Sequence, residues 1–272
     1  MIFTADLHTH STASDGQYTP TQLVGLAKDK GLQLLALTDH DTLDGLEEAV
    51  QAGEALGLRV LRGVELSAKE HHNFHILGYG FGAEAPGLKE LCDKLRDGRD
   101  DRKYRILAYL KEKGMELTLE EVEELAGGDI IARPHFARAM VRRGYVASNR
   151  EAFDRFLDTK EYQIKVPRFK ADAKGCIDAI KAAGGKTSLA HPYQMRLPDG
   201  ELETLVAELA GYGLDAIEGY YPKYSPEQQA FYHRLARQHG LHLTGGSDFH
   251  GEKVKPEVKL GAVELELDWL VG

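Results

Sequence analysis

The sequence contains little cysteine. Cys92 and Cys176 are the two cysteines among 272 residues, and they do not form a Cys-x-x-Cys pair. This excludes the disulfide-rich small domains and the four-cysteine zinc sites. We expect both thiols to be small buried apolar groups in a reducing compartment, rather than a disulfide or metal ligands.

The sequence also lacks an excess of positive charge. Its 34 lysines and arginines stand against 43 aspartates and glutamates, which gives a net charge of -9. A protein that wraps a long nucleic acid usually carries a basic surplus, so we expect no extended nucleic-acid binding. A small phosphorylated ligand remains compatible with this balance, because a few arginines and bound metal reverse the field locally.

Long apolar runs are absent as well. No stretch approaches the length needed to cross a bilayer, and Met1 leads directly into a strand-like run without a basic and apolar leader. We therefore expect a cytoplasmic protein with no secretory signal and no membrane association. With 42% hydrophobic and 28% charged residues, the composition is that of a globular protein with a large core.

Strand and helix patterns alternate in both terminal parts of the chain. Helical periodicity separates most of the short apolar runs, which predict strands at residues 2–7, 33–37, 59–66, 74–80, 186–190, 214–218, 241–246 and 260–267. This alternation predicts an α/β fold in which helices lie outside a parallel sheet. Thr19 and Pro20 mark one helix start, and a second helix is expected over 41–56 with Asp41 or Thr42 as its cap.

The middle of the chain has a different pattern, because its periodicity is helical throughout. It predicts helices at residues 88–113, 118–125, 133–143 and 149–157. A helical block inside an α/β pattern indicates an insertion. We interpret 86–164 as a helical insertion subdomain that caps the active site, and 1–85 with 165–272 as the barrel domain.

Six of the twelve histidines lie at or just past the end of a short apolar run, and three carboxylates occupy similar places. They are His8, His10, His40, His75, His191 and His250, with Asp15, Glu65 and Asp248. In parallel α/β sheets and barrels, functional residues gather where strands give way to helices. Neutral imidazoles and carboxylates are ligands of Zn²⁺, Mn²⁺ and Fe²⁺. The pattern indicates a multinuclear metal cluster.

Each of these residues also has a structural interpretation. His8 and His10 share one face of a strand, as a chelating pair does, but pairs of surface histidines are common. Asp15 precedes a glycine, which is frequent in simple turns. Glu65 would need a lysine or arginine partner if it did not bind cations, and His191 alone would fit a core histidine.

The combined motifs resemble the PHP (polymerase and histidinol phosphatase) superfamily, and they extend over nearly the whole chain. The resemblance rests on His8-Thr9-His10, Asp15, Thr38-Asp39-His40-Asp41, Gly63-Val64-Glu65, His75, Ala190-His191-Pro192 and Gly246-Ser247-Asp248-Phe249-His250. The segment from Ala132 to Arg138 is similar to the branch of small metal-dependent phosphoesterases, which includes nucleoside 3',5'-bisphosphate phosphatases and 5'-3' exoribonucleases. The resemblance implies a distorted (β/α)7 TIM-like barrel.

The resemblance also implies a trinuclear metal centre. One ion would be held by His8, His10, Glu65 and Asp248, a second by Asp15, His40 and His250, and a third by Glu65, His75 and His191. Histidinol phosphatases of this type often carry histidine where this chain has Asp15. That substitution favours Mn²⁺, with Zn²⁺ or Fe²⁺ as alternatives.

We expect hydrolysis of a phosphate monoester by a metal-activated hydroxide, on a nucleotide such as a nucleoside 3',5'-bisphosphate or on a short 5'-phosphorylated oligonucleotide. Asp248, His191 and His250 are the expected catalytic residues, the two histidines as candidates for proton transfer to the leaving oxygen. Arg133 and His135 are expected to bind the substrate's phosphate, because arginine offers a planar fork of donors and Pro134 indicates a helix start. The alternative for Arg133 is a solvent-facing helix residue.

Other functions remain open at this stage. A histidinol phosphatase and a non-catalytic PHP scaffold domain are the alternatives within the superfamily. An amidohydrolase would also use a barrel with an early His-x-His, but it usually depends on a lysine at a strand end, and no lysine here ends a strand. The oligomeric state is not indicated by the sequence.

Overall fold

The structure is a computed structural model that describes residues 1–126, 131, 133–166, 169–261 and 263–271. The chain divides into two compact units, and each is described by itself. The first comprises Met1–Asp93 and Lys170–Gly272, and the second comprises Lys94–Phe169.

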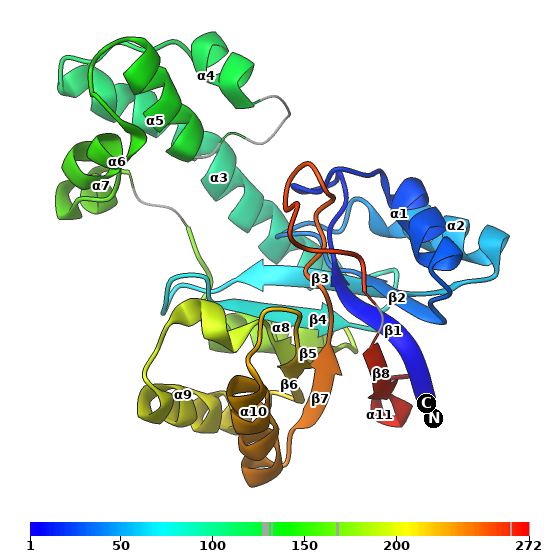
Figure 1. Cartoon of the computed structure of the whole chain (residues 1–272). Helices are drawn as coiled ribbons and strands as arrows, with labels where there is room; N and C mark the ends of the chain where they lie inside the picture. Colours follow the sequence, from blue (N-terminus) through cyan, green and yellow to red (C-terminus); the bar gives the residue numbers. More distant parts are fainter. Residues whose placement is uncertain (127–130, 132, 167–168, 262, 272) are drawn as a thin grey trace. The chain divides into compact units, whose positions relative to one another are not determined.

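The first unit is built on one eight-stranded sheet (Figure 1). Its strands are β1 (Ile2–Thr9), β2 (Leu34–Leu37), β3 (Arg59–Ser67), β4 (His75–Tyr79), β5 (Lys186–Leu189), β6 (Ala216–Tyr220), β7 (His242–Gly245) and β8 (Val263–Glu266). They follow the order β7-β6-β5-β4-β3-β2-β1-β8. All eight predicted strands are therefore present.

The sheet is mixed rather than parallel throughout, which corrects the expected strand directions. Strand β4 runs antiparallel to both β3 and β5, and β8 runs antiparallel to β1. The cause is the short connection between β3 and β4, which holds no helix and so cannot make a parallel crossover. As a consequence, the first residue of β4 lies at the same rim of the sheet as the last residues of its neighbours.

The sheet nearly closes into a barrel, because the segment after β7 returns to β1. Thr9 and Phe249 form a parallel bridge. The backbone N–H of His10 donates to the carbonyl of Phe249 at 2.9 Å, and the N–H of Asp248 donates to the carbonyl of His8 at 2.8 Å. The expected TIM-like barrel is confirmed in this distorted form.

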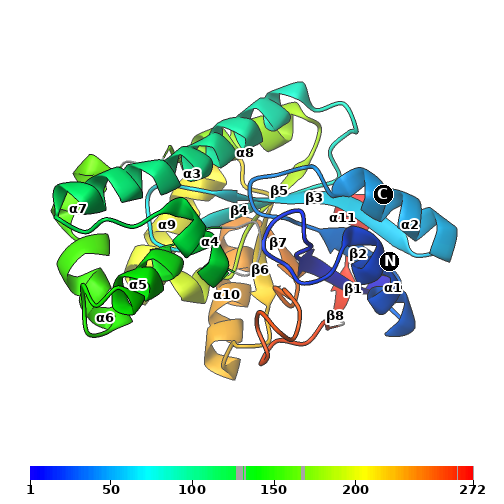
Figure 2. The same ribbon diagram turned by 90° about the horizontal axis from the view of Figure 1, so that it is seen from above.

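Helices cover the outside of the barrel. They are α1 (Pro20–Asp29), α2 (Leu46–Leu56), α8 (Ala173–Ala182), α9 (Asp199–Gly211) and α10 (Pro226–His239), with a 3-10 turn at Pro192–Met195 and a short α11 (Asp268–Val271). Figures 1 and 2 both show α1 and α2 side by side next to β1 and β2. The predicted start of α1 is confirmed, since Thr19 forms a capping box with Gln22 and Pro20 opens the helix.

The predicted start of α2 was wrong by five residues, since the helix begins at Leu46 with Gly45 as its cap. Asp41 has a positive φ of 51°, which is incompatible with a helix. Its carboxylate accepts hydrogen bonds from the backbone N–H of Ser67 at 2.7 Å and from the Ser67 hydroxyl at 2.9 Å. Asp41 therefore ties the end of β2 to the end of β3 instead of capping a helix.

The second unit is helical, with its own hydrophobic core. It holds most of α3 (Pro86–Glu112), then α4 (Leu119–Ala126), α5 (Arg133–Arg142), α6 (Asn149–Ala152), a π-helical turn at Phe153–Leu157 and α7 (Lys160–Lys165). Buried Leu110, Val122, Phe136, Met140 and Tyr162 belong to this core. None of the described helices is both long enough and apolar enough to cross a membrane.

Both cysteines are buried and neither forms a disulfide, as the sequence predicted. Burial raises the pKa of the Cys176 thiol, so it stays protonated and unreactive at neutral pH.

Candidate metal centre

The nine side chains that the sequence singled out as metal ligands all lie at one rim of the barrel. His8 ends β1 with Thr9, His75 opens the reversed β4, and Glu65 lies near the end of β3. The others occupy the loops that follow β1, β2, β5 and β7, and they are His10, Asp15, His40, His191, Asp248 and His250. The reversal of β4 explains how a residue at the start of a strand joins residues at strand ends.

Two imidazoles and two carboxylates converge at the first group. The Nε2 atoms of His8 and His10 lie 3.2 and 3.3 Å from Oε2 of Glu65. The same two nitrogens lie 3.7 and 3.3 Å from Oδ1 of Asp248. Three of these residues (His8, His10 and Asp248) have donor atoms within 4.8 Å of one another, which is close enough to share one ion.

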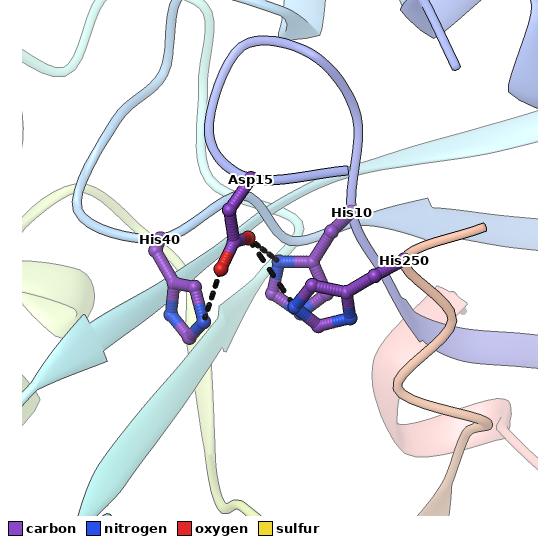
Figure 3. Close-up of side chains that lie close together, drawn as sticks. All are labelled: His10, Asp15, His40 and His250. Carbon is purple, nitrogen blue, oxygen red and sulfur yellow. Dashed lines mark ion pairs between the residues drawn. The ribbon is translucent and has the colours of Figure 1, made fainter. Parts of the chain in front are cut away.

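A second group surrounds Asp15 (Figure 3). Its carboxylate oxygens lie 3.2 Å from Nε2 of His250, 3.8 Å from Nδ1 of His10 and 3.9 Å from Nε2 of His40. In the figure, the carboxylate of Asp15 points between the three rings, which come from different loops. The four donor atoms again lie within 4.8 Å of one another.

Glu65 also contacts a third set of imidazoles through its other oxygen. Its Oε1 lies 2.7 Å from Nδ1 of His75 and 2.9 Å from Nε2 of His191. Nδ1 of His40 lies 2.9 Å from Oε2. The side chain of Glu65 has no exposed surface. A single buried carboxylate therefore stands among five imidazoles, with each of its oxygens facing a different subset.

The donor atoms of these residues fit metal ions better than they fit one another. Several are buried without a hydrogen-bond partner among the described residues: Nε2 of His8, both ring nitrogens of His10, Nδ1 of His40, Nδ1 of His191 and Oε2 of Glu65. Buried polar atoms are normally paired, because leaving them unpaired is costly. Buried imidazole nitrogens and carboxylate oxygens that converge in this way form a chelating set for cations.

The electrostatics of the group favour ionised carboxylates. Burial alone would raise the pKa of Glu65, but the imidazoles of His40, His75 and His8 hold that pKa well below its usual range. Burial would likewise raise the pKa of Asp248, yet His10, His8 and Lys255 hold it well below the ordinary value. Both carboxylates are therefore charged at neutral pH, as metal ligation requires.

Three of these histidines, His75, His250 and His10, differ in their pKa. Burial lowers the pKa of His75 and of His250 to about 4, so both rings are neutral at pH 7 and available as ligands. Burial also opposes the charged form of His10, but the neighbouring Asp248 and Glu65 outweigh it and raise its pKa to about 9. A cation that binds His10 must therefore displace a proton from the ring.

Comparison with known proteins shows the family to which this chain belongs. The PHP domain model matches residues 6–190. The chain belongs to the PHP domain family. It is 36% identical to the 5'-3' exoribonuclease Rnm of Escherichia coli strain K12 over 261 residues, which cover 94% of this chain and 87% of that protein. The resemblance inferred from the motifs is confirmed.

Two further relatives extend the comparison. The 3',5'-nucleoside bisphosphate phosphatase of Chromobacterium violaceum is 33% identical over 247 residues, covering 90% of this chain and 86% of that protein. A crystal structure described as a metal-dependent phosphoesterase of Bifidobacterium adolescentis has a TM-score of 0.73 and 33% identity, over 97% of this chain and 92% of that one. This PHP protein is a metal-dependent phosphoesterase and thus a hydrolase.

The rim of the PHP barrel is held together by a buried aspartate, Asp6. One of its oxygens accepts hydrogen bonds from the backbone N–H of Ser247 at 2.9 Å and of His8 at 3.2 Å. The other accepts from the Ser247 hydroxyl at 2.6 Å and the Gly261 N–H at 3.1 Å. Asp6 therefore fastens the loop that carries Asp248 to the strand that carries His8.

Close backbone packing at the same place requires glycine. A Cβ on Gly246 would lie 2.4 Å from Cβ of His8, so any side chain there would push the loop away from β1. Asp248 itself has a positive φ of 58°, and His191 has a φ of 24°. Strained backbone at two expected ligands fits a functional site whose geometry is imposed by its surroundings.

Asp39 supports the loop that holds Asp15. Its carboxylate accepts hydrogen bonds from the backbone N–H of Ser11 at 2.7 Å, the Ser11 hydroxyl at 2.6 Å and the Ser14 hydroxyl at 2.5 Å. The loop between β1 and α1 is thereby fixed against the end of β2. Asp15 is presented to the imidazoles from this fixed loop.

Glu218, in β6, is an acidic residue that contacts two of the expected ligands, His8 and His191. Its Oε1 lies 3.1 Å from Nδ1 of His8, and its Oε2 accepts the backbone N–H of His191 at 2.6 Å. A carboxylate on the far nitrogen of a ligating imidazole orients the ring and raises its basicity. The feature of the sequence that indicates such a role is a glutamate within an otherwise apolar strand.

Replacing Glu218 with glutamine should weaken metal binding or activity about ten- to a hundredfold, because the ring of His8 loses its charged partner. The amide preserves the size of the side chain, so the barrel should stay folded. Titration of the metal-free protein with Mn²⁺, together with kcat of the loaded enzyme, measures the effect. The matched control is Glu54→Gln on the exposed face of α2. Equal metal affinity in both variants would contradict this role.

The expected substrate-binding residues lie in the second unit. Arg133 is the first residue of α5, as predicted, and Ala132 before it lies outside the described residues. Nη1 of Arg133 donates to Oδ1 of Asp158 at 2.8 Å and to the carbonyl of Leu157 at 3.2 Å. Burial, followed by the charge of Arg138, lowers the pKa of His135, which is therefore neutral at pH 7. The contact of Arg133 and His135 with a phosphate stays a prediction.

Proposed function

We propose that this phosphoesterase hydrolyses the phosphate monoester of a nucleotide, such as a nucleoside 3',5'-bisphosphate, or of a short 5'-phosphorylated oligonucleotide. The single observation that carries the proposal is the convergence of nine imidazole and carboxylate side chains at one barrel rim, with buried donor atoms that lack hydrogen-bond partners among the described residues. The names of the relatives from E. coli and C. violaceum support the substrate class.

We infer three divalent ions, held by the three groups of side chains. The first ion would be held by His8, His10, Glu65 and Asp248, the second by Asp15, His40 and His250, and the third by Glu65, His75 and His191. The distances from the two oxygens of Glu65 to imidazoles of the first and third groups support a bridging role for this residue. His40 lies near both Asp15 and Glu65, so it is placed to respond to occupancy of either group.

Manganese is the metal we propose, with zinc and iron as alternatives. The donors are a mixture of imidazole nitrogen and carboxylate oxygen, without a thiolate. Such a set suits Mn²⁺, Fe²⁺ and Zn²⁺, and the carboxylate of Asp15 shifts the second group toward harder ions.

When bound, divalent ions in this arrangement would supply a deprotonated water at neutral pH and neutralise charge on the phosphoryl oxygens. The protein's own contribution is to hold in place the negatively charged side chains that would bind these ions. Glu65 and Asp248 are ionised and buried, and Glu218 and Asp6 fix the residues around them. His191 and His250 are the residues that we propose for proton transfer to the leaving oxygen, and His250, with a pKa of about 4, must gain a proton when substrate binds in order to act in this way.

A substrate panel tests the proposal directly. Purified protein would be analysed for metal content and then assayed for phosphate release from nucleoside 3',5'-bisphosphates, short 5'-phosphorylated RNA and histidinol phosphate. We expect more than one equivalent of transition metal and preferential turnover of the nucleotide substrates. A folded protein that takes up no metal would support a non-catalytic scaffold domain, and preference for histidinol phosphate would replace the proposed substrate.

Replacing Arg133 with alanine should raise KM about tenfold or more with a smaller change in kcat, because the variant loses a charge-assisted contact with the substrate's phosphate. The control is Arg150→Ala, whose side chain is 91% exposed. Because Arg133 also pairs with Asp158, thermal unfolding should be followed in parallel. Unchanged kinetics in Arg133→Ala would remove this residue from the site.

A further inference from the structure

Asp248 uses its two oxygens differently, and the second oxygen faces a lysine. Its Oδ1 lies 3.3 Å from Nε2 of His10 and 3.4 Å from Nδ1 of His250. Its Oδ2 accepts hydrogen bonds from Nζ of Lys255 at 2.9 Å and from the hydroxyl of Tyr221 at 2.8 Å. Asp248 therefore contacts both the histidine rings of the expected metal centre and the amine of Lys255, which lies in the loop after β7.

This lysine is carried on a firmly anchored loop. The backbone N–H of Lys255 donates to the carbonyl of Gly251 at 2.9 Å, which closes a turn just after His250. The N–H of Lys253 donates to Oε1 of Gln17 at 2.8 Å, and Glu257 pairs with Lys223 at 2.8 Å. Gly251 has a φ of 98°, where other residues are strained. The position of the amine is therefore built into the fold.

Tyr221 helps to place the amine. Its side chain is buried, with 6% exposure, and its hydroxyl both donates to Asp248 and receives Nε2 of Gln194 at 3.2 Å. Burial, followed by the negative charge of Asp248, raises the pKa of Tyr221, so the phenol stays protonated. Oδ2 of Asp248 thus accepts from two neutral donors, the Tyr221 hydroxyl and Nε2 of Gln194 at 3.4 Å, and from the charged amine of Lys255.

The ion pair with Asp248 uses only part of the hydrogen-bonding capacity of Lys255. An ammonium group has three N–H donors, and Asp248 takes one of them. The side chain remains 31% exposed, whereas that of Asp248 is 3% exposed. An accessible cation that is hydrogen-bonded to a residue of the expected metal centre is suited to an anion that approaches the same centre.

We propose that Lys255 binds a non-bridging oxygen of the phosphoryl group that is hydrolysed, in the position that Asp248 and Tyr221 define. This inference rests on the proposed function, because it assigns the lysine to the same substrate. Lys255 belongs to the barrel unit, so its contribution is separate from the one proposed for Arg133 in the helical unit. It adds an anion-binding residue that the motifs of the sequence did not indicate.

The experiment compares metal-loaded wild-type protein with Lys255→Met and Lys255→Arg, and with Lys253→Met as a matched control on the exposed side of the same loop. Three quantities are measured: the metal content, the affinity for inorganic phosphate by calorimetry, and kcat/KM for the best nucleotide of the substrate panel. We expect Lys255→Met to lose about ten- to a hundredfold in phosphate affinity and in kcat/KM at unchanged metal content. Lys255→Arg should recover most of the phosphate affinity, and Lys253→Met should behave as wild type.

Two outcomes would overturn the inference. One is unchanged phosphate affinity in Lys255→Met. The other is a loss of metal that accounts for the loss of phosphate binding, which would show that Lys255 acts only by holding Asp248. Calorimetry with phosphate needs no turnover, so it tests Lys255 even if none of the panel is hydrolysed. Failure of hydrolysis in the wild-type protein would count against the proposed function alone.

Discussion

Alanine at position 248 should abolish turnover without unfolding the barrel. Oδ1 of Asp248 lies among the imidazoles of His8, His10 and His250, so the variant loses a charged oxygen that three rings share. We expect kcat to fall by about a thousandfold or more, which is the scale for removing a principal electrostatic group from an active site. The loss should be measured with saturating Mn²⁺, so that weakened metal affinity does not limit the rate.

The fold of this variant should be intact, because the barrel core is formed by apolar residues such as Ala5, Leu7 and Leu77. Circular dichroism and thermal unfolding check this expectation, and Asp29→Ala on the exposed end of α1 is the control. His8→Ala should behave in the same way, since it removes another of the side chains proposed to hold the first ion. Residual activity within tenfold of wild type in either variant would exclude that residue from the centre.

Replacing Glu65 with glutamine should have the largest effect on metal content. The oxygens of Glu65 face imidazoles of the first and third groups, at distances from 2.7 to 3.3 Å. The amide keeps the size but removes the charge, and its NH₂ group would point a donor at nitrogens that must also bind cations. We expect the variant to lose more than one equivalent of bound metal and to lose activity at least as completely as Asp248→Ala.

Comparing the metal content of three variants tests this prediction more stringently. Asp15→Asn changes a carboxylate that we propose as a ligand of the second ion alone, although it also lies 3.8 Å from Nδ1 of His10, so it should lose about one equivalent and leave the other two sites filled. Glu47→Gln, on an exposed carboxylate of α2, should lose none. Metal analysis after equilibrium dialysis distinguishes the three variants. Equal losses in Glu65→Gln and Asp15→Asn would argue against a bridging role for Glu65.

Both predictions follow from the burial of charge. Glu65 and Asp248 are almost completely inaccessible to water, and a buried carboxylate is stable only with compensating charge. In the metal-free protein that charge comes from protonated imidazoles, since burial opposes the charged form of His10 and of His8 but the neighbouring carboxylates raise both pKa values. Metal uptake should therefore release protons at neutral pH and weaken as the pH falls.

Much of this molecule could be predicted from residue order alone. The alternation of apolar runs with helical periodicity predicted eight strands and the helices between them, and Thr19 with Pro20 predicted the start of α1. With the exception of His75, the same patterns predicted which histidines and carboxylates lie at one rim, because residue type and position relative to a strand end are local properties. The motifs that these residues form resemble the PHP family, and the comparison with known proteins confirmed that resemblance.

Tertiary structure decided what depends on pairing between distant segments. The reversal of β4 places His75 at the rim, and strand direction is set by chain connection and pairing rather than by hydrophobic pattern. The start of α2 depends on Asp41 binding Ser67, 26 residues away. Lys255 reaches Asp248 across a turn of the same loop, whereas Glu218 acquires its contact with His8, which is 210 residues away, only when the barrel closes. Long-range packing alone determines such contacts, and periodicity along the sequence does not reveal them.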